Sequence, residues 1–464
     1  METRMLSSSL EEVASTPMAQ VKIAALILTL APLYYVSYKL HSRSNESHRS
    51  ATTPKTLDRT VWQQQWLDTD LLQPWDPLAI QVKCNDTKWN SNLVFDLAGA
   101  NGGVGNVRAE FLDFLFYAFE SGASIVLPTM AVRREDDLFD VWGAGRANFS
   151  NMFDEVWFRE AMSEACPQMK IYESAEELGT GWRREGQTYD PRVPGSRKDS
   201  SQVQWVQQTE AWLADRNITV DAPAVVTIEH TMWETNTRGE RPAFRRALGM
   251  LLHFRPDVRH YAAIAMFNMA TTEGLDLFPT DRVHEKAFYG AHLRTEADTI
   301  SAGWLEPHSN TEVGLNFTLQ TSYYMQAAVA HGLSTIFAAS GNASEVEHFK
   351  QIAATNRPPL TVLSKWDLLS KAEGEALRDM HWDRQALVDL EILKRCSLFG
   401  GMAKSSFAFL IAVARTTYME EYSMVQDPWF ARHRDTMVAF ENKLNKIWGR
   451  NQLNEERVPK GAWP

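Results

Sequence analysis

Short apolar runs alternate with amphipathic stretches along most of this chain, and that alternation is the feature that most narrows its possible folds. Val94–Ala98 has the pattern of a buried strand, a glycine-rich turn follows, and residues 109–120 have helical spacing. Ile125–Pro128 then has the pattern of a second strand. A strand, a helix and another strand in this order form a βαβ unit, so the alternation predicts an α/β fold with parallel sheets.

The alternation falls into two blocks. The first also contains an expected strand at Ala224–Ile228 and a helix around residues 244–254, while the polar residues 183–202 are expected to form a loop that is mobile or touches an acceptor. The second begins near residue 287, with expected strands at 288–292, 334–338, 361–364 and 397–400. Two such blocks predict two Rossmann-like domains with a cleft between them, over residues 61–283 and 284–464.

One apolar segment near the N-terminus, Ile23–Tyr38, stands apart from an otherwise ordinary globular composition. Lysines flank it, and tyrosines gather at its C-terminal end as in an interfacial belt. We expect a transmembrane signal anchor at 23–38, preceded by a cytosolic tail at 1–22 and followed by a flexible polar stem at 39–60. A cleaved signal peptide and a buried helix of a soluble domain are the alternatives.

Acceptor sites for N-glycosylation indicate on which side of the membrane the long C-terminal part lies. All six Asn-x-Ser/Thr sites follow the apolar segment, at Asn45, Asn85, Asn148, Asn217, Asn316 and Asn342. Because N-glycans are added in secretory proteins, we expect a single-pass type II membrane protein with its C-terminal part in the lumen. The tail Lys460–Pro464 is not an ER retrieval signal, which favours the Golgi over the ER.

Charge and cysteine content exclude some classes of function. The formal net charge is −11 and no long basic run is present, which argues against nucleic acid as the main partner. The three cysteines, Cys84, Cys166 and Cys396, allow one disulfide with three possible pairings and contain no Cys-x-x-Cys spacing. The one Asp-x-Asp motif, Asp68–Asp70, lies just past the stem and away from any predicted strand end, so no metal site is expected.

The glycine-rich turn Gly99–Gly105, followed by Asn106, is the first of three motifs that carry chemistry. It lies between a strand and a helix, where glycines let the backbone approach a phosphate and the helix N-terminus favours negative charge. Taken alone, it fits a dinucleotide fingerprint, with Arg133 and Arg134 available for a 2′-phosphate. A tight turn without any ligand is the plainer interpretation.

The second motif, His292-Leu-Arg294, lies at the C-terminal end of a predicted strand, where ligands of open α/β sheets bind. An arginine at this place can offer a planar fork to a diphosphate and stabilise the charge of a departing nucleotide. The alternative is a surface Arg294 paired with Glu296 or Asp298, beside a buried His292 whose hydrogen bonds are satisfied.

The third motif combines Asp389, on a predicted helix, with Ser405-Ser406-Phe407 after a buried strand. Hydroxyl and backbone N–H groups at a helix start can hold phosphate, and a carboxylate can accept two hydrogen bonds from the edge of guanine. A helix cap and a solvated acid are the alternative at these positions.

In this order and spacing, the three motifs together resemble the protein O-fucosyltransferases. Val388–Phe407 resembles the C-terminal signature of that family without a gap, and His292-Leu-Arg294 resembles its H-L-R motif. Gly105-Asn106 stands where the family has its glycine–asparagine turn. Shorter stretches extend the likeness over roughly residues 91–415, at Phe153–Phe158, Phe254–Pro256 and Ile336–Gly341.

The resemblance implies a GT-B fold, in which two Rossmann-like domains face a cleft, and an enzyme that moves fucose from GDP-fucose with inversion and without a metal. Arg294 would be the catalytic residue that neutralises the β-phosphate as the sugar–phosphate bond breaks. Donor contacts are implied for Gly105, Asn106, His292, Arg294, Asp389 (on guanine), Ser406 and Phe407. The implied partners are GDP-fucose and a protein or glycan hydroxyl, with the membrane bound through the N-terminal anchor.

The chain departs from the family just before Asn106, where Gly103, Val104 and Gly105 replace the usual Arg-Phe or Glu-Gly-Phe. The glutamate that serves as base in some members has no counterpart, so the general base is unassigned. Two other functions stay open. One is a membrane-tethered NAD(P)-dependent oxidoreductase using Gly99–Gly105, and the other is a catalytically inactive relative that binds glycans or nucleotides.

Overall fold

The computed structural model describes residues 58–135, 137–138, 140, 145–189, 211–212, 214–216, 218, 222–228, 237–296, 316–403, 405–423, 438–449 and 461–464. The chain divides into two compact units, Met1–Asp58 and Arg59–Pro464, and both α/β blocks belong to the second. A division of that unit at 283/284 stays a prediction. The predicted tail, anchor and nearly all of the stem lie outside the described residues. None of the helices in the described ranges has the length and apolar character needed to cross a bilayer.

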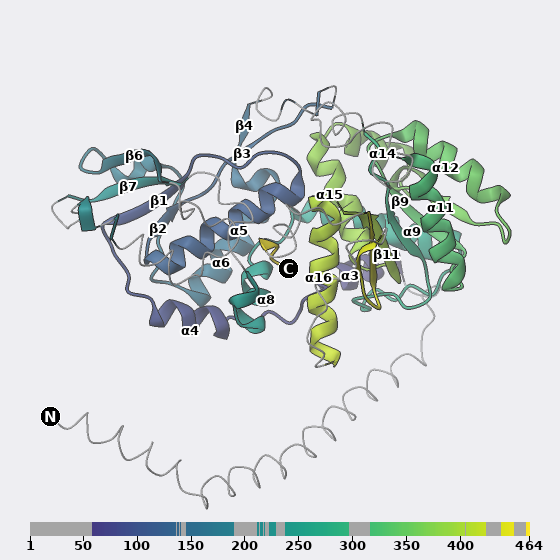
Figure 1. The fold of residues 1–464 in the computed structure, drawn as a ribbon, viewed down its shortest axis with the longest axis horizontal. Helices are drawn as coiled ribbons and strands as arrows, with labels where there is room; N and C mark the ends of the chain where they lie inside the picture. Colours follow the sequence, from purple (N-terminus) through teal and green to yellow (C-terminus); the bar gives the residue numbers. More distant parts are fainter. Residues whose placement is uncertain are drawn as a thin grey trace, which may run out of the picture. The chain divides into compact units, whose positions relative to one another are not determined.

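The first α/β block is built on a five-stranded sheet (Figure 1). The elements from residue 59 to residue 272 are, in chain order, α3 (Arg59–Leu67), α4 (Leu78–Asp86), β1 (Leu93–Leu97), α5 (Val104–Ser121), β2 (Ser124–Val126), β3 (Met130–Ala131), β4 (Arg146–Ala147), η2 (Phe149–Asn151), α6 (Glu155–Ala165), β5 (Ile171–Tyr172), η3 (Ala175–Leu178), β6 (Arg183–Tyr189), β7 (Ala224–Ile228), η4 (Thr237–Gly239), α8 (Pro242–Met250) and α9 (Pro256–Thr272). Two of these helices belong with the second block, because α3 packs on α9 and α9 packs on α13 (Lys365–Leu368) and α15 (Trp382–Leu393) (Figure 1). The strand order is β5-β2-β1-β7-β6, with every neighbouring pair parallel. The predicted βαβ unit is therefore confirmed as β1, α5 and β2.

One sequence expectation for this block was wrong. Residues 183–189 were expected within a polar loop, but they form β6, which pairs with β7 at the edge of the sheet. An edge strand needs a partner on one side only and tolerates polar side chains, so it lacks the apolar pattern that marks a buried strand. The rest of the expected loop, residues 190–202, lies outside the described residues.

The predicted helix near 244–254 is α8, which ends earlier, at Met250.

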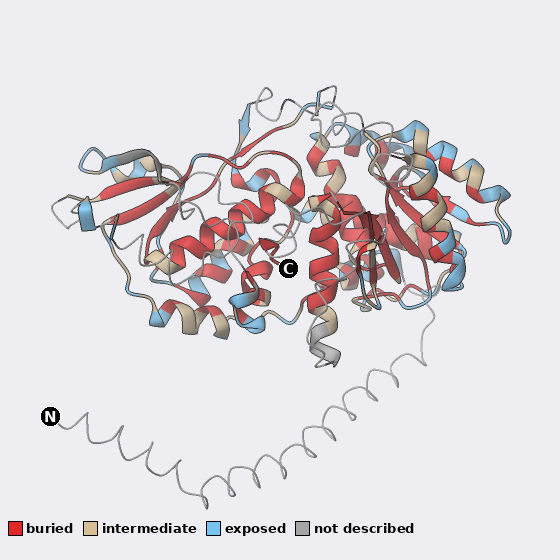
Figure 2. Cartoon of the chain, in the orientation of Figure 1, coloured by how far each residue is buried: buried red, intermediate tan, exposed pale blue. Residues whose placement is uncertain are grey.

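The second block contains a six-stranded sheet. Its elements are β8 (Tyr289–His292), α11 (Phe317–Ala330), β9 (Thr335–Ala339), α12 (Ala343–Thr355), β10 (Thr361–Leu363), α13 (Lys365–Leu368), α14 (Lys371–Arg378), α15 (Trp382–Leu393), β11 (Leu398–Met402), α16 (Ser406–Ser423), β12 (Val438–Glu441) and β13 (Asn445–Trp448). The order is β10-β9-β8-β11-β13-β12, parallel except for the last pair. The four predicted strands are confirmed as β8 to β11, and all five residues of β9 and of β11 are buried (Figure 2).

Helix α16 joins the two blocks, because it packs on β11 and β13 of the second sheet and also on α5 of the first block (Figure 1). The contact with α5 includes a close approach at Gly105. A Cβ added at Gly105 would lie 2.7 Å from the carbonyl carbon of Ser406 and 2.9 Å from the backbone nitrogen of Phe407. Only a residue without a side chain fits this position, so the glycine sets how closely the two helices approach.

The C-terminal residues 461–464 also return to α5. Trp463 is 1% exposed, its ring packs against Phe116, and its Nε1 donates a 2.7 Å hydrogen bond to Oδ1 of Asp113. Arg108 of α5 donates to the carbonyl oxygens of Gly249 and Pro464, at 2.7 and 2.5 Å. These last residues therefore complete the core around a helix that lies some 350 positions earlier in the chain.

A disulfide joins Cys84, in α4, to Cys166, which ends α6. Cys396 is buried and free. Of the three pairings that the sequence allowed, the structure contains the one that links the two outer helices of the first block.

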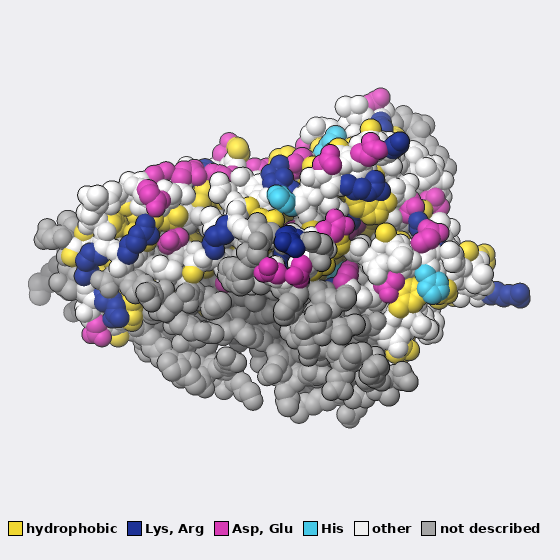
Figure 3. All heavy atoms as spheres, turned by 90° about the horizontal axis from the view of Figure 1, so that it is seen from above, with side chains coloured by type: hydrophobic (Ala, Val, Ile, Leu, Met, Phe, Trp, Pro, Cys, Tyr) yellow, Lys and Arg dark blue, Asp and Glu magenta, His cyan; other side chains and the backbone are white. Residues whose placement is uncertain are grey.

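Charges of both signs are mixed on the molecular surface. On the face drawn in Figure 3, acidic and basic side chains are interspersed among uncharged ones. The large hydrophobic side chains that are exposed in the described part are isolated from one another in the sequence, at Val61, Leu78, Val156 and Val329. The described side chains on this face do not form the basic stripe that nucleic-acid-binding proteins present.

Gly105→Ala is expected to lower thermal stability, because its Cβ would overlap the Ser406 backbone. Overpacking costs about 1–3 kcal/mol of unfolding free energy, more than the roughly 0.5–1 kcal/mol that alanine gains over glycine in a helix. Thermal unfolding followed by circular dichroism measures the change. Gly181→Ala is the matched control, since no atom lies within 4 Å of its added Cβ. Equal melting temperatures for the two variants would contradict this packing.

Candidate functional site

The carboxyl ends of the parallel strands β8, β9, β10 and β11 lie at one edge of the second sheet. This is the edge at which open α/β sheets bind ligands. The residues at or just after these strand ends are, in strand order, His292 and Arg294, Gly341, Lys365, and Ser406. Two of the three predicted motifs therefore lie at the place where the fold favours a site.

His292 is buried at the end of β8, with 8% of its surface exposed. Its ring packs on Phe407, with 4.7 Å between ring centroids, and its Nδ1 lies 3.4 Å from Oγ of Ser405. Burial is the main cause that lowers the pKa of His292 to about 4. The Glu296 charge opposes this effect and is weaker than burial, and the Arg294 charge adds to it. The imidazole is therefore neutral near pH 7, and it contacts two residues of the third predicted motif.

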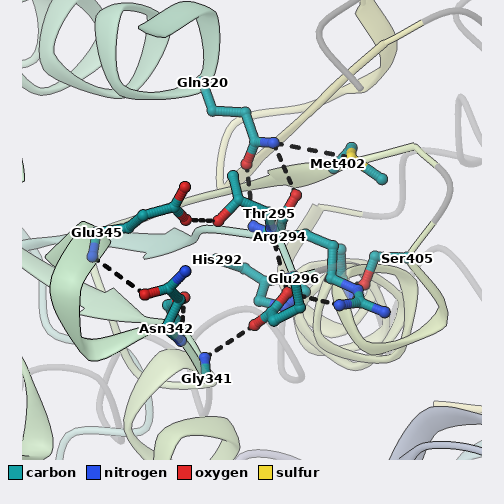
Figure 4. A network of polar contacts seen from close by, with 12 residues as sticks. His292, Arg294, Thr295, Glu296, Gln320, Gly341, Asn342, Glu345, Met402 and Ser405 are labelled. Atoms are coloured by element: carbon teal, nitrogen blue, oxygen red, sulfur yellow. Dashed lines mark hydrogen bonds and ion pairs between the residues drawn. The ribbon is translucent and has the colours of Figure 1, made fainter. Parts of the chain in front are cut away.

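Neighbouring side chains bind both the backbone and the guanidinium of Arg294 (Figure 4). The buried side chain of Gln320 accepts from the Arg294 N–H at 3.0 Å and donates to its carbonyl oxygen at 2.9 Å. Nη1 of Arg294 lies 2.5 Å from Oε2 of Glu296, and both side chains are less than one-fifth exposed. Burial opposes ionisation of Glu296, but the Arg294 guanidinium outweighs it and lowers the pKa of that carboxyl. Arg294 thus has the predicted partner Glu296, in a half-buried site rather than on the surface.

The contact between α5 and α16 brings the first and third motifs together. Gly105 lies against Ser406 and Phe407, and Phe407 in turn contacts His292. Asn106 lies over the turn, since a Cβ at Gly102 would come within 2.6 Å of Nδ2 of Asn106. Hence five of the predicted donor-binding residues, from both blocks, lie in one neighbourhood.

Ser405 begins α16 as its cap, with Oγ accepting from the Ala408 N–H at 3.2 Å. The helix-cap alternative is therefore correct for Ser405. The next two residues, Ser406 and Phe407, stand in the first turn of α16, where backbone N–H groups have no partner within the helix. Such N–H groups can bind phosphate oxygens.

A cavity of about 370 Å³ lies beside the ends of β9 and β10. The indoles of Trp366 and Trp382 line it, and aromatic faces of this kind suit a flat ring. Asp389 also lines the cavity and its Oδ2 lies 2.5 Å from Nζ of Lys365. Burial raises the pKa of Asp389, and the Lys365 ammonium opposes that rise. Asp389 is thus a buried, paired carboxylate and not the solvated acid of the alternative interpretation.

Glu296 connects this cavity to Arg294. One carboxylate oxygen binds Arg294, and the other accepts a 2.8 Å hydrogen bond from the backbone N–H of Gly341 (Figure 4). Gly341 lines the cavity, so the aromatic cavity, Glu296 and Arg294 form one contiguous site. The first block also contributes to it, because Glu135 lines the same cavity.

Arg133, the residue that a dinucleotide site would use for a 2′-phosphate, is paired with a carboxylate of the second block. Its Nη2 lies 2.5 Å from Oδ1 of Asp383, on α15, and these side chains are 12% and 2% exposed. The guanidinium stands beside Gly103, at 3.3 Å from a Cβ placed there. Arg133 therefore links the glycine turn of the first block to the second block.

The Asp-x-Asp motif is structural at Asp70. Burial opposes ionisation of this carboxyl, but the charges of Lys394, His253 and Arg259 and the N–H of Leu72 hold its pKa well below the usual range. A carboxylate surrounded by cationic groups is a poor ligand for a cation. In the part of the chain that the structure describes, no group of three or more His, Cys, Asp or Glu side chains is placed to hold a metal ion.

Lys365, Trp366 and Trp382 were missed at the level of sequence. Lys365 and Trp366 directly follow the predicted strand at 361–364, so the rule that sites gather at carboxyl strand ends was sufficient to find them. Trp382 begins the helix that carries Asp389, seven positions earlier, and that spacing places both on one helix face.

A model of one protein family matches this chain, and its description is GDP-fucose protein O-fucosyltransferase, over residues 93–418. Similar solved structures include POFUT1 in complex with GDP, which is 12% identical, covers 78% of this chain and 100% of its own, and has a TM-score of 0.45. Another is the fucosyltransferase NodZ from Bradyrhizobium, at 16% identity, with coverage of 70% and 94% and a TM-score of 0.37. No curated protein sequence matches. Because the family model spans more than half of its length, the chain belongs to the GDP-fucose protein O-fucosyltransferase family.

Proposed function

We propose that this protein transfers fucose from GDP-fucose to a hydroxyl group of a protein or glycan, with inversion at the anomeric carbon. Family membership supports GDP-fucose as the donor. The observation that carries the proposal is the contiguous path from Asp389, in an aromatic-lined cavity, through Glu296 to Arg294. A nucleotide with its base in the cavity would extend its diphosphate past Gly341 toward Arg294.

The base end of the site suits guanine. Asp389 presents a carboxylate, which accepts hydrogen bonds and donates none when ionised. Guanine offers two neighbouring donors on its Watson–Crick edge, N1–H and the exocyclic amino group, and a carboxylate accepts both. Stacking against Trp366 or Trp382 adds an apolar contact that any base would share. Asp389 is therefore expected to contribute to base selectivity.

The diphosphate end of the site suits a departing nucleotide. Glycosyl transfer passes through an oxocarbenium-like transition state in which negative charge builds up on the leaving diphosphate. Preorganised donors that neutralise this charge lower the barrier. A guanidinium has five N–H donors, so Arg294 can bind a phosphate oxygen while it keeps its contact with Glu296. The first turn of α16, at Ser406 and Phe407, supplies backbone N–H groups and the positive end of the helix dipole.

Two contacts argue against the oxidoreductase alternative. The last glycine of the turn, Gly105, packs against the backbone of α16 and does not face an open pyrophosphate site. Arg133, the candidate for a 2′-phosphate, is paired with Asp383. Both features of a dinucleotide fingerprint are used for contact between the two blocks.

Arg294→Ala is expected to reduce fucose transfer by at least about 100-fold, because the charge on the leaving GDP would be left without its main counter-charge. GDP release from GDP-fucose with a panel of acceptors measures the rate, and NMR of the product gives the anomeric configuration. Arg357→Ala, at an exposed arginine, is the matched control. A full transfer rate in Arg294→Ala would contradict the role of Arg294, and donor binding without turnover in the unmodified protein would indicate an inactive relative.

Asp389→Asn is expected to change the preferred base from guanine to xanthine. The amide carries an N–H that matches the C2 carbonyl of xanthine and loses the charge that favours the guanine donors. We expect the affinity for GDP to fall about 10- to 100-fold and the affinity for xanthosine diphosphate to rise, both measured by calorimetric titration. Asp379→Asn, at an exposed aspartate, is the control. Unchanged GDP affinity in Asp389→Asn would remove Asp389 from the base site.

We also propose that the protein is a type II Golgi membrane protein whose catalytic part is luminal. The Cys84–Cys166 disulfide supports this, because such bonds persist in secretory compartments and are rare in the cytosol. The glycosylation acceptors Asn85 and Asn148 are exposed. The apolar segment at 23–38 supports the anchor.

For the full-length protein expressed in a eukaryotic host, we expect peptide-N-glycosidase to lower its apparent mass. Asn85→Gln and Asn148→Gln should each remove one glycan, whereas Asn356→Gln, outside any acceptor sequence, should remove none. Protease added to intact microsomes should leave all but a short N-terminal tail protected, and alkaline carbonate should not extract the protein. An unglycosylated chain that is digested in intact microsomes would show that the luminal placement is wrong.

A further inference from the structure

The wall of the aromatic cavity contains two buried opposite charges, Lys365 and Asp389. Their side chains are 6% and 7% exposed, and the ammonium nitrogen lies 2.5 Å from the carboxylate oxygen. Both line the cavity and are not sealed within the core. Burial of two charges costs free energy that their mutual attraction rarely exceeds, so such a pair is weak evidence for a role in stability. Its position in a ligand cavity points to recognition.

The local structure assigns this lysine to Asp389. Lys365 begins α13, with one residue between it and the end of β10. Asp367 is the carboxylate of the same helix, but it is bound by groups other than Lys365. Asp367 accepts from Ser364 in a capping box and from Lys350, whose Nζ lies 2.6 Å from Oδ1. Two cations contact the Trp366 ring, with Nζ of Lys365 at 5.0 Å and the guanidinium carbon of Arg378 at 4.5 Å from its centroid. These contacts fix both Lys365 and the indole beside it.

An ammonium and a carboxylate side by side match the edge of one purine. An ammonium has three N–H donors and a carboxylate has only acceptors. Guanine presents an acceptor, O6, beside the donors N1–H and N2–H₂. Adenine presents a donor, N6–H₂, where guanine has O6, and an acceptor at N1. A lysine that faces the C6 substituent can therefore donate to O6 of guanine. On adenine it would face the N6 amino group, which is also a donor, so guanine is favoured.

We propose that Lys365 is a specificity-determining residue that donates a hydrogen bond to O6 of guanine while Asp389 accepts from N1–H and N2–H₂. This inference rests on the proposed function, since it names how the same site selects a GDP-sugar over an ADP-sugar. One N–H of Lys365 stays directed to Asp389, so the pair acts as a single donor–acceptor unit. The same contact opposes the rise in the pKa of Asp389 that burial causes.

The test measures the affinities of the full-length, detergent-solubilised protein for GDP and ADP by calorimetric titration. Lys365→Met keeps an unbranched side chain, shorter by one atom, and removes its charge and donors. We expect its GDP affinity to fall about 10- to 100-fold with little change for ADP, so that the GDP-to-ADP preference collapses. Lys365→Gln retains an N–H donor and should keep part of the preference. Lys371→Met, whose side chain is 90% exposed, should leave both affinities unchanged.

A base analogue separates the base contact from a phosphate contact. The diphosphate of 2-aminopurine riboside lacks O6 and also the N1–H, so only its 2-amino group can donate to Asp389 and its binding is weaker from the start. Because it has no O6, Lys365→Met should weaken its binding by a far smaller factor than that of GDP. Equal weakening of GDP, ADP and this analogue would assign Lys365 to the diphosphate and overturn the proposal, as would unchanged GDP affinity. If the unmodified protein does not prefer GDP to ADP, the proposed function itself fails. If it does and Lys365→Met keeps that preference, only this inference fails.

Discussion

The approach of α5 to α16 is the contact on which the rest of the site depends. It is possible because residue 105 has no side chain, and any larger residue would push against the backbone of Ser406. The same contact sets the position of the first turn of α16, and Phe407 of that turn packs on His292. Through His292 the constraint reaches the end of β8, where Arg294 follows. A steric condition in one block thus positions the charged groups of the other.

Four buried or half-buried cations in the described part of the chain are of two kinds, which differ in what binds them. Arg415 and Arg395 donate mainly to backbone carbonyls of the surrounding loops and helices. Those partners are neutral and fixed, so these arginines tie elements together. Arg294 and Lys365 are bound instead by carboxylates, at the rim and in the wall of a cavity. A cation that is paired with one acidic side chain has further N–H donors for a bound anion or base, which suits it to a ligand site.

The sequence was sufficient for the parts of the fold that are decided by local pattern. The strand at Ala224–Ile228 was predicted with the bounds it has, because parallel strands covered on both faces are nearly continuous apolar runs. The edge strand β6 has no such signal, since its residues Arg183 and Arg184 are polar. His292 and Arg294 were found from their place at a strand end. The pairing of Lys365 with Asp389, and of Gly105 with Ser406, depends on which distant segments meet, and spacing along the chain does not contain that information.

The burial of Trp463 has a consequence for the order in which the molecule can be completed during synthesis. Helix α5 leaves the ribosome early, with Asp113 and Arg108 on the face that residues 461–464 will cover. Some 350 residues must be translated before the indole reaches Asp113. Until then this face of the first-made block stays open, although its sheet is already complete by residue 228. The final packing of the first block is therefore coupled to completion of the second.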